Sequence, residues 1–244
     1  MTKELGCKHG HMIGISKVLM EDGMNKDYAQ IYKVTTNVYK RVKAATKIVA
    51  TDLHGTEITF DLNPDKLKWV QDNGKIGFGE MRNLPGGEVF GSPENANGVM
   101  VVWELGDYFS EKYGVLEESV KVTLEDGFIT DVVASIDKPS DKTLEIIAEF
   151  KDYIAEFENG KRAGELGIGT LVGLEGFVGN LLQDEKFPGI HVAFGNPYPD
   201  ETGADWKCPT HIDMICKDVT IKVYKGNSEE TIMNDGKFTE EILQ

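Results

Sequence analysis

The sequence predicts an α+β fold in which a largely antiparallel sheet, with a few helices, carries most of the core. Predicted strands outnumber predicted helices, and turn signals such as Glu125-Asp126-Gly127 join successive strands as hairpins. Apolar residues recur three or four positions apart, as on one face of a helix, in two segments, residues 25–46 and 140–157. Strands joined by hairpins pair antiparallel, whereas parallel strands need a long crossover between them.

The first half of the chain predicts one helix followed by short strands. Isoleucine and valine residues recur three or four positions apart within residues 25–46, which predicts a helix with one buried face. Residues 47–52 and 56–62 predict the two arms of a hairpin, because apolar and polar residues alternate in the second arm. Residues 74–93 are rich in glycine and predict a loop.

The second half predicts more strands and the second long helix. Residues 99–104, 119–124 and 128–136 predict strands, and a helix begins at a Ser140 or Asp141 cap, with Leu144 on its buried face. The remaining expectations are a glycine-rich loop over residues 164–179, a short helix over 178–184, a strand over 189–194, a turn-rich stretch over 195–209 and one or two strands over 210–224.

Length and charge limit the possible functions. A chain of 244 residues can bury a sizeable core, and we expect one domain over residues 1–244, with residues 1–24 irregular. The net charge of −15 disfavours binding to nucleic acid or to an anionic membrane. Three scattered cysteines and the lack of a signal-peptide pattern predict a cytoplasmic protein.

The most distinctive short motif is Thr210-His211-Ile212-Asp213. In a strand, His211 and Asp213 point to the same face, so an imidazole and a carboxylate lie side by side. This pair would form half of a metal site. The motif alone equally fits a surface pair or a buried histidine with a local partner.

Two further segments carry groups that can bind a metal. His191 lies in an apolar strand that ends at a Gly-Asn-Pro turn, and Tyr198 follows that turn. Glu88 and Glu165 are each embedded in glycines, which let the backbone approach closely and aim the carboxylate. A mixed set of carboxylates and imidazoles suits two adjacent divalent cations that activate a water molecule.

At these motifs the chain resembles the aminopeptidase T family of metallopeptidases. The matching stretches, in the order of the family, are NLPGGEVFGSP, AGELGIGT, GIHVAFGNPY and THIDM, and ATDLHGTEITFDL matches upstream. The resemblance covers roughly residues 28–222. It implies an aminopeptidase that removes N-terminal residues from peptides or acts on a similar small substrate.

The resemblance also implies a co-catalytic centre of two divalent cations, which would be Zn, Co or Mn. The metal ligands of the family fall on Glu88, Glu165, His191, Tyr198, His211 and Asp213. Glu88, Glu165 and Tyr198 would also have catalytic roles, and either glutamate could serve as general base instead of ligand.

The sequence departs from the family in ways that leave other functions open. Family members usually have a further N-terminal domain, which is not expected here, and an acidic residue often stands where this chain has Gly87. The related 2,5-dihydroxypyridine 5,6-dioxygenases would use His191, His211 and Asp213 around one Fe(II) ion. A metal-binding relative without catalytic activity is the third possibility.

Self-association is also expected from the sequence. Without an additional domain, apolar surface beside the site would remain uncovered, and a second copy of the chain could cover it in a homo-oligomer. The aromatic residues of residues 105–116, expected to be irregular, and Trp206 are the candidates for that surface.

Overall fold

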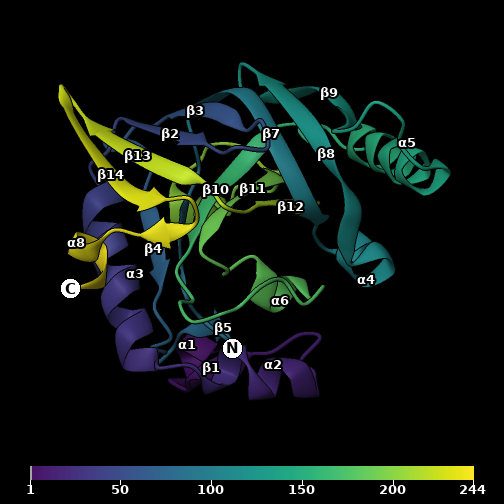
Figure 1. The fold of residues 1–244 in the computed structure, drawn as a ribbon. Helices are drawn as coiled ribbons and strands as arrows, with labels where there is room; N and C mark the ends of the chain where they lie inside the picture. The colour runs from purple at the N-terminus through teal and green to yellow at the C-terminus, as the bar shows by residue number, and fades with distance from the viewer. Residues whose placement is uncertain (1) are drawn as a thin grey trace.

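The protein, described here by a computed structural model over residues 2–244, is built around one large curled sheet (Figure 1). Among the described residues thirteen strands form this sheet, in the order β15-β14-β13-β2-β3-β7-β12-β11-β10-β6-β4, and β8 and β9 branch from β7. The strand pairs within this sheet are antiparallel, which confirms the predicted fold class.

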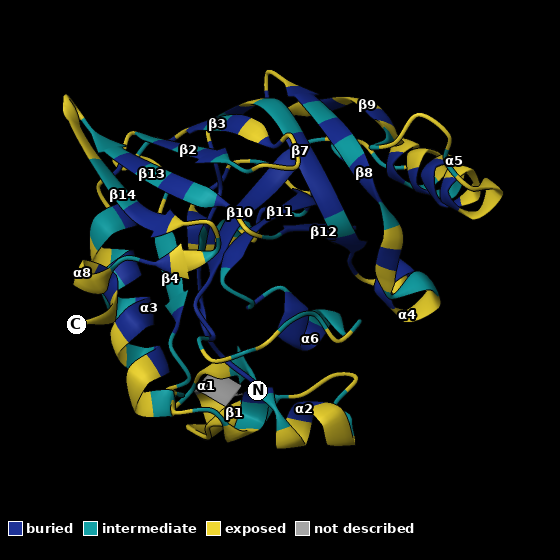
Figure 2. Cartoon of the chain, in the orientation of Figure 1, coloured by how far each residue is buried: buried dark blue, intermediate teal, exposed yellow. Residues whose placement is uncertain are grey.

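The strands are short except for β7 and β8. Their bounds are β1 His9–His11, β2 Lys47–Thr51, β3 Glu57–Asp61, β4 Trp69–Asp72, β5 Met81–Asn83, β6 Glu88–Gly91, β7 Asn95–Leu105, β8 Val115–Glu125, β9 Phe128–Ala134, β10 Ala163–Gly169, β11 Gly189–Gly195, β12 His211–Cys216, β13 Thr220–Lys225, β14 Ser228–Asn234 and β15 Lys237–Phe238. Strands β10, β11 and β12 lie in the interior of the sheet and are almost wholly buried (Figure 2).

The helices lie around this sheet. Their bounds are α1 Thr2–Leu5, α2 Lys17–Glu21, α3 Tyr28–Val42, α4 Tyr108–Tyr113, α5 Asp141–Ala155, α6 Leu181–Asp184, α7 Pro199–Thr202 and α8 Glu240–Leu243, with a 3-10 turn at Gly23–Asn25. None of the helices in the described part of the chain is long and apolar enough to span a bilayer.

The two long helices form where the sequence predicts them. The Asp27 side chain accepts hydrogen bonds from the first backbone N–H groups of α3, and the Ser140 hydroxyl caps α5 in the same way. Helix α3 packs against β4, β6 and α8, and α5 packs against β9. Leu144 was expected in the buried face of α5 but is 51% exposed, because the buried stripe runs through Ile146 and Ile147 instead.

Three glycine-rich or irregular predictions are wrong. Residues 74–93 do not form one loop, because they contain the strands β5 and β6. Residues 164–179 do not form one continuous loop, because their first part belongs to the buried strand β10. The glycines there allow other groups to approach, which the sequence pattern alone cannot distinguish from turn formation. Residues 1–24 were expected to be irregular, but the described part contains α1, α2 and β1, and β1 pairs in parallel with β5.

The surface proposed for self-association also differs from expectation. Residues 105–116 contain the helix α4, and Phe109 is buried in the core rather than exposed. Trp206 is half-buried, and the Arg162 guanidinium lies 4.3 Å from its ring centroid. Homo-oligomer formation stays a prediction.

The one or two strands predicted over residues 210–224 are the strands β12 and β13, which do not pair with each other.

Candidate metal centre

The register of four adjacent strands places five of the predicted site residues on one face of the sheet. Glu165 of β10 lies opposite Ala193 of β11, which lies opposite Asp213 of β12. Directly opposed residues share a face, and so do residues two apart along a strand. His191 is two residues from Ala193, and His211 is two residues from Asp213, so both join this face. Glu88 of β6 joins it as well, because it lies opposite Gly169, which is four residues from Glu165 on β10.

Glycines make room for these side chains. The residue opposite His191 is Gly167, the residue opposite Glu88 is Gly169, and the residue opposite His211 is Gly195. A Cβ atom on Gly167 would lie 1.9 Å from Nε2 of His191, so no other residue fits without moving the imidazole. The glycines of the AGELGIG stretch therefore provide space for ligands within a strand.

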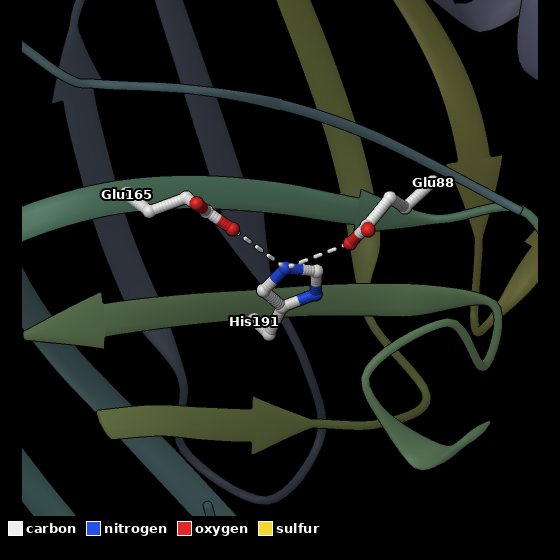
Figure 3. Close-up of side chains that lie close together, drawn as sticks. All are labelled: Glu88, Glu165 and His191. Atoms are coloured by element: carbon white, nitrogen blue, oxygen red, sulfur yellow. Dashed lines mark hydrogen bonds and ion pairs between the residues drawn. The ribbon is translucent and has the colours of Figure 1, made fainter. Parts of the chain in front are cut away.

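Glu88, Glu165 and His191 converge on one point, and we call them the Glu88 group. Both carboxylates point toward the same imidazole nitrogen (Figure 3). Nε2 of His191 lies 3.3 Å from Oε1 of Glu165 and 3.5 Å from Oε2 of Glu88. Ligands held about 2.1 Å from a tetrahedral ion lie about 3.4 Å apart. The spacing in this group therefore fits a divalent cation.

Glu165, His211 and Asp213 form a second convergent set, which we call the Asp213 group. Nε2 of His211 lies 3.7 Å from Oδ2 of Asp213, and Oδ1 of Asp213 is buried without a hydrogen-bond partner. Nδ1 of His211 lies 2.8 Å from the carbonyl oxygen of Asn196. A carbonyl can only accept, so Nδ1 donates its proton and Nε2 is left to bind a metal. Glu165 belongs to both groups.

The two groups together bring three carboxyl groups close to two imidazoles, and burial and mutual charges shift their pKa values. Burial raises the pKa of Glu88 and the pKa of Asp213. Burial lowers the pKa of His191, but the hydrogen bond with Glu165 and the charge of Asp213 outweigh it and bring this pKa to about 9. For Glu165, burial raises the pKa, and the His191 hydrogen bond and the His211 charge together lower it below its usual value. Such a site favours binding of a cation.

Tyr198 lies beside the two groups rather than within them. It has a left-handed backbone conformation at the start of α7, and its ring centroid is 4.6 Å from that of His211. Burial and the nearby charges of Glu165 and Asp213 raise the pKa of its phenol, which therefore keeps its proton. In this state Tyr198 is a hydrogen-bond donor at the edge of the site.

Three charged residues at the site were missed by the sequence analysis. Lys186 is fully buried, and its ammonium contacts Glu88 at 3.4 Å and also contacts Glu185. Asp72 of β4 lies opposite Glu88 of β6, and burial together with the charge of Glu88 raises its pKa to about 6. The charged triplet Asp184-Glu185-Lys186, seven to five residues before His191, is the sequence signal that could have pointed to this neighbourhood.

Two adjoining cavities open beside these residues. One, of about 180 Å³, is lined by Glu88 and Phe90, and the other, of about 310 Å³, is lined by Ile13 and Asp213. Tyr198 lines both. Pockets for drug-sized ligands measure about 300–1,000 Å³, so these cavities suit a small substrate.

Comparison with known proteins gives the same fold and a family. No curated protein matches the sequence. The structure is similar to that of AmpT from Thermus thermophilus, with a TM-score of 0.66 and 18% identity over 87% of this chain and 55% of the AmpT chain. It is also similar to 2,5-dihydroxypyridine dioxygenase from Pseudomonas putida KT2440, with a TM-score of 0.70 and 17% identity over 95% of this chain and 66% of that chain.

At these identities the two structures establish the fold alone, and the chain spans 55% and 66% of their lengths. A sequence profile of a protein family establishes more than the fold, because it matches residues 15–238, which include all six predicted site residues. The chain belongs to the thermophilic metalloprotease (M29) family.

Proposed function

We propose that this protein is a metal-dependent, aminopeptidase-like hydrolase that removes N-terminal residues from peptides at a centre of two divalent cations. The observation that carries the proposal is the pair of convergent groups that share Glu165. Two groups with a common carboxylate fit two adjacent cations, and membership of a metalloprotease family supports a peptide substrate. Zn, Co or Mn would suit this mixture of carboxylate and imidazole ligands.

Each residue of the centre has a distinct role in the proposed reaction. Divalent cations in such a centre supply Lewis acidity, which activates a water molecule and polarises the peptide carbonyl. Glu165 serves both groups, His191 and Glu88 complete one, and His211 and Asp213 complete the other. One of the two glutamates accepts the proton of the attacking water. Tyr198 keeps its phenolic proton and donates a hydrogen bond to the oxygen on which charge develops.

The geometry favours this reaction over ring cleavage by a dioxygenase. A dioxygenase of the facial-triad type would need His191, His211 and Asp213 around one Fe(II) ion. Among the described residues these three do not form a convergent group, whereas each of the two observed groups includes Glu165. The similarity to the dioxygenase structure is one of fold.

Metal analysis combined with substrate assays tests the proposal. Protein purified without chelator should contain one to two equivalents of Zn, Co or Mn, and chelator should abolish cleavage of aminoacyl amides. One equivalent of iron, with oxygen consumption on a dihydroxylated pyridine, would replace the proposal by the dioxygenase alternative. Bound metal with neither activity would indicate a binding protein.

A further inference from the structure

Lys186 is a buried cation whose position is fixed by its backbone. Its side chain has no exposed surface. Its N–H donates to the carbonyl of Gln183, and its carbonyl accepts from the N–H of Leu171, both at 2.9 Å. A Cβ on Gly169 would lie 2.6 Å from the carbonyl carbon of Lys186, so this segment is pressed against β10. The ammonium therefore stays buried and exerts its charge on the groups that surround it.

The contacts of Lys186 lie on one side of the metal centre. Its Nζ is 3.4 Å from Oε1 of Glu88 and also contacts the Glu185 carboxylate. The other oxygen of Glu88 faces His191, so one carboxylate joins the ammonium to the Glu88 group. In the part of the chain that the structure describes, no ion pair connects Lys186 with His211 or Asp213.

We propose that Lys186 makes the two cation positions unequal, so that the Asp213 group binds its ion tightly and the Glu88 group binds its ion weakly. The proposal rests on the two-cation centre proposed above. An ammonium beside Glu88 repels a divalent ion on the same carboxylate, and this repulsion is strong where water is excluded. The Asp213 group has two ligands from one strand and no direct contact with Lys186, whose charge reaches this group only through the shared Glu165, so its affinity is reduced less.

Metal titration of the whole protein tests this asymmetry. Apo protein is dialysed against buffered free Zn²⁺ or Mn²⁺, and the bound metal is counted by mass spectrometry. Wild-type protein should bind two equivalents whose dissociation constants differ at least tenfold. Glu88→Gln should remove the weaker equivalent, and Asp213→Asn should remove the tighter one. This pair of variants assigns each affinity to its group without an activity assay.

Neutral replacements of Lys186 give the decisive comparison. Lys186→Met should tighten the weaker equivalent at least tenfold and change the tighter one less than threefold. Lys186→Gln, which can still donate to Glu88, should do the same and guards against misfolding of the methionine variant. Thermal unfolding gives a second reading, because saturation with Zn²⁺ should raise the melting temperature more in both variants than in wild type. Lys222→Met is the matched control, since Lys222 of β13 pairs with Glu229 of β14 and both side chains are partly exposed.

The outcomes separate this inference from the function proposed above. Two wild-type equivalents of equal affinity, or a weaker equivalent that loosens or stays unchanged in Lys186→Gln, would overturn the inference and leave the hydrolase proposal standing. A wild-type protein that binds no divalent cation would overturn both.

Discussion

Replacing Gly167 with alanine tests the role of the glycines in β10. The new Cβ would lie 1.9 Å from Nε2 of His191, whereas ordinary contact begins near 3.4 Å, so the ring must move by about 1.5 Å. His191 is 1% exposed, so the displacement must be taken up inside the buried site. Overpacking of this kind costs about 1–3 kcal/mol. At about 2–4 °C per kcal/mol for a chain of this size, the melting temperature should fall by about 2–12 °C.

The same displacement should weaken metal binding, because it takes Nε2 away from the carboxylates of Glu88 and Glu165. We expect a loss of about 10–100-fold in affinity, the range typical when a residue that orients a metal ligand is mutated. Gly176→Ala is the matched control, since a Cβ there would meet nothing within 4 Å. Metal content and thermal unfolding are measured on both variants. Wild-type metal affinity and melting temperature in Gly167→Ala would show that β10 tolerates a side chain at this position and would contradict the role assigned to this glycine.

Three further predictions concern the surroundings of the centre. Tyr198→Phe should keep its metal and lower turnover about 100–1,000-fold, since the ring stays and the hydrogen-bond donor is lost; loss of metal instead would make Tyr198 a ligand. Burial and the charge of Asp184 raise the pKa of Glu104 from 4.5 to about 8, so the folded protein holds a proton that the unfolded chain releases. Stability should therefore fall by up to about 4 kcal/mol as pH rises from about 5 to 8, and Glu104→Gln should flatten that dependence in thermal unfolding; an unchanged profile would contradict it. The Gln183 side chain accepts a hydrogen bond from the Gly23 N–H at 3.0 Å and donates one to Asp22 at 2.9 Å. Gln183→Ala should therefore lower the free energy of unfolding by about 1–3 kcal/mol and speed hydrogen exchange in residues 17–25. Unchanged exchange there would show that this contact does not hold the segment.

Much of the fold follows from local patterns in the sequence. Helices α3 and α5 have helical apolar spacing and side-chain caps, and the β2–β3 hairpin has alternating residues around a turn. These features depend on neighbours in the chain, which a single sequence displays. Five of the six predicted site residues come together in the structure, in one group with Glu88, Glu165 and His191 and another with Glu165, His211 and Asp213, and their role as ligands stays a prediction.

What the sequence could not show depends on contacts between distant strands. The sequence pattern predicts a loop at Gly167, because glycine is common both in turns and where two segments approach closely. Only the register that sets Gly167 opposite His191 distinguishes these two roles. From the sequence alone a solvent-exposed side chain is expected for Lys186, because a buried lysine requires charged partners that only the fold brings together. Asp72 reads as part of a turn until the pairing of β4 with β6 sets it opposite Glu88.

The role proposed for the two groups that share Glu165 is to hold catalytic divalent cations. Metal content and hydrolysis of an aminoacyl amide are measured together on wild type, Asp213→Asn and the control His54→Ala, whose histidine lies at the β2–β3 turn outside both groups. We expect one to two equivalents of Zn, Co or Mn and hydrolysis in wild type and control, with the metal of the Asp213 group and hydrolysis lost together in Asp213→Asn. Full metal content and full activity in Asp213→Asn would contradict it.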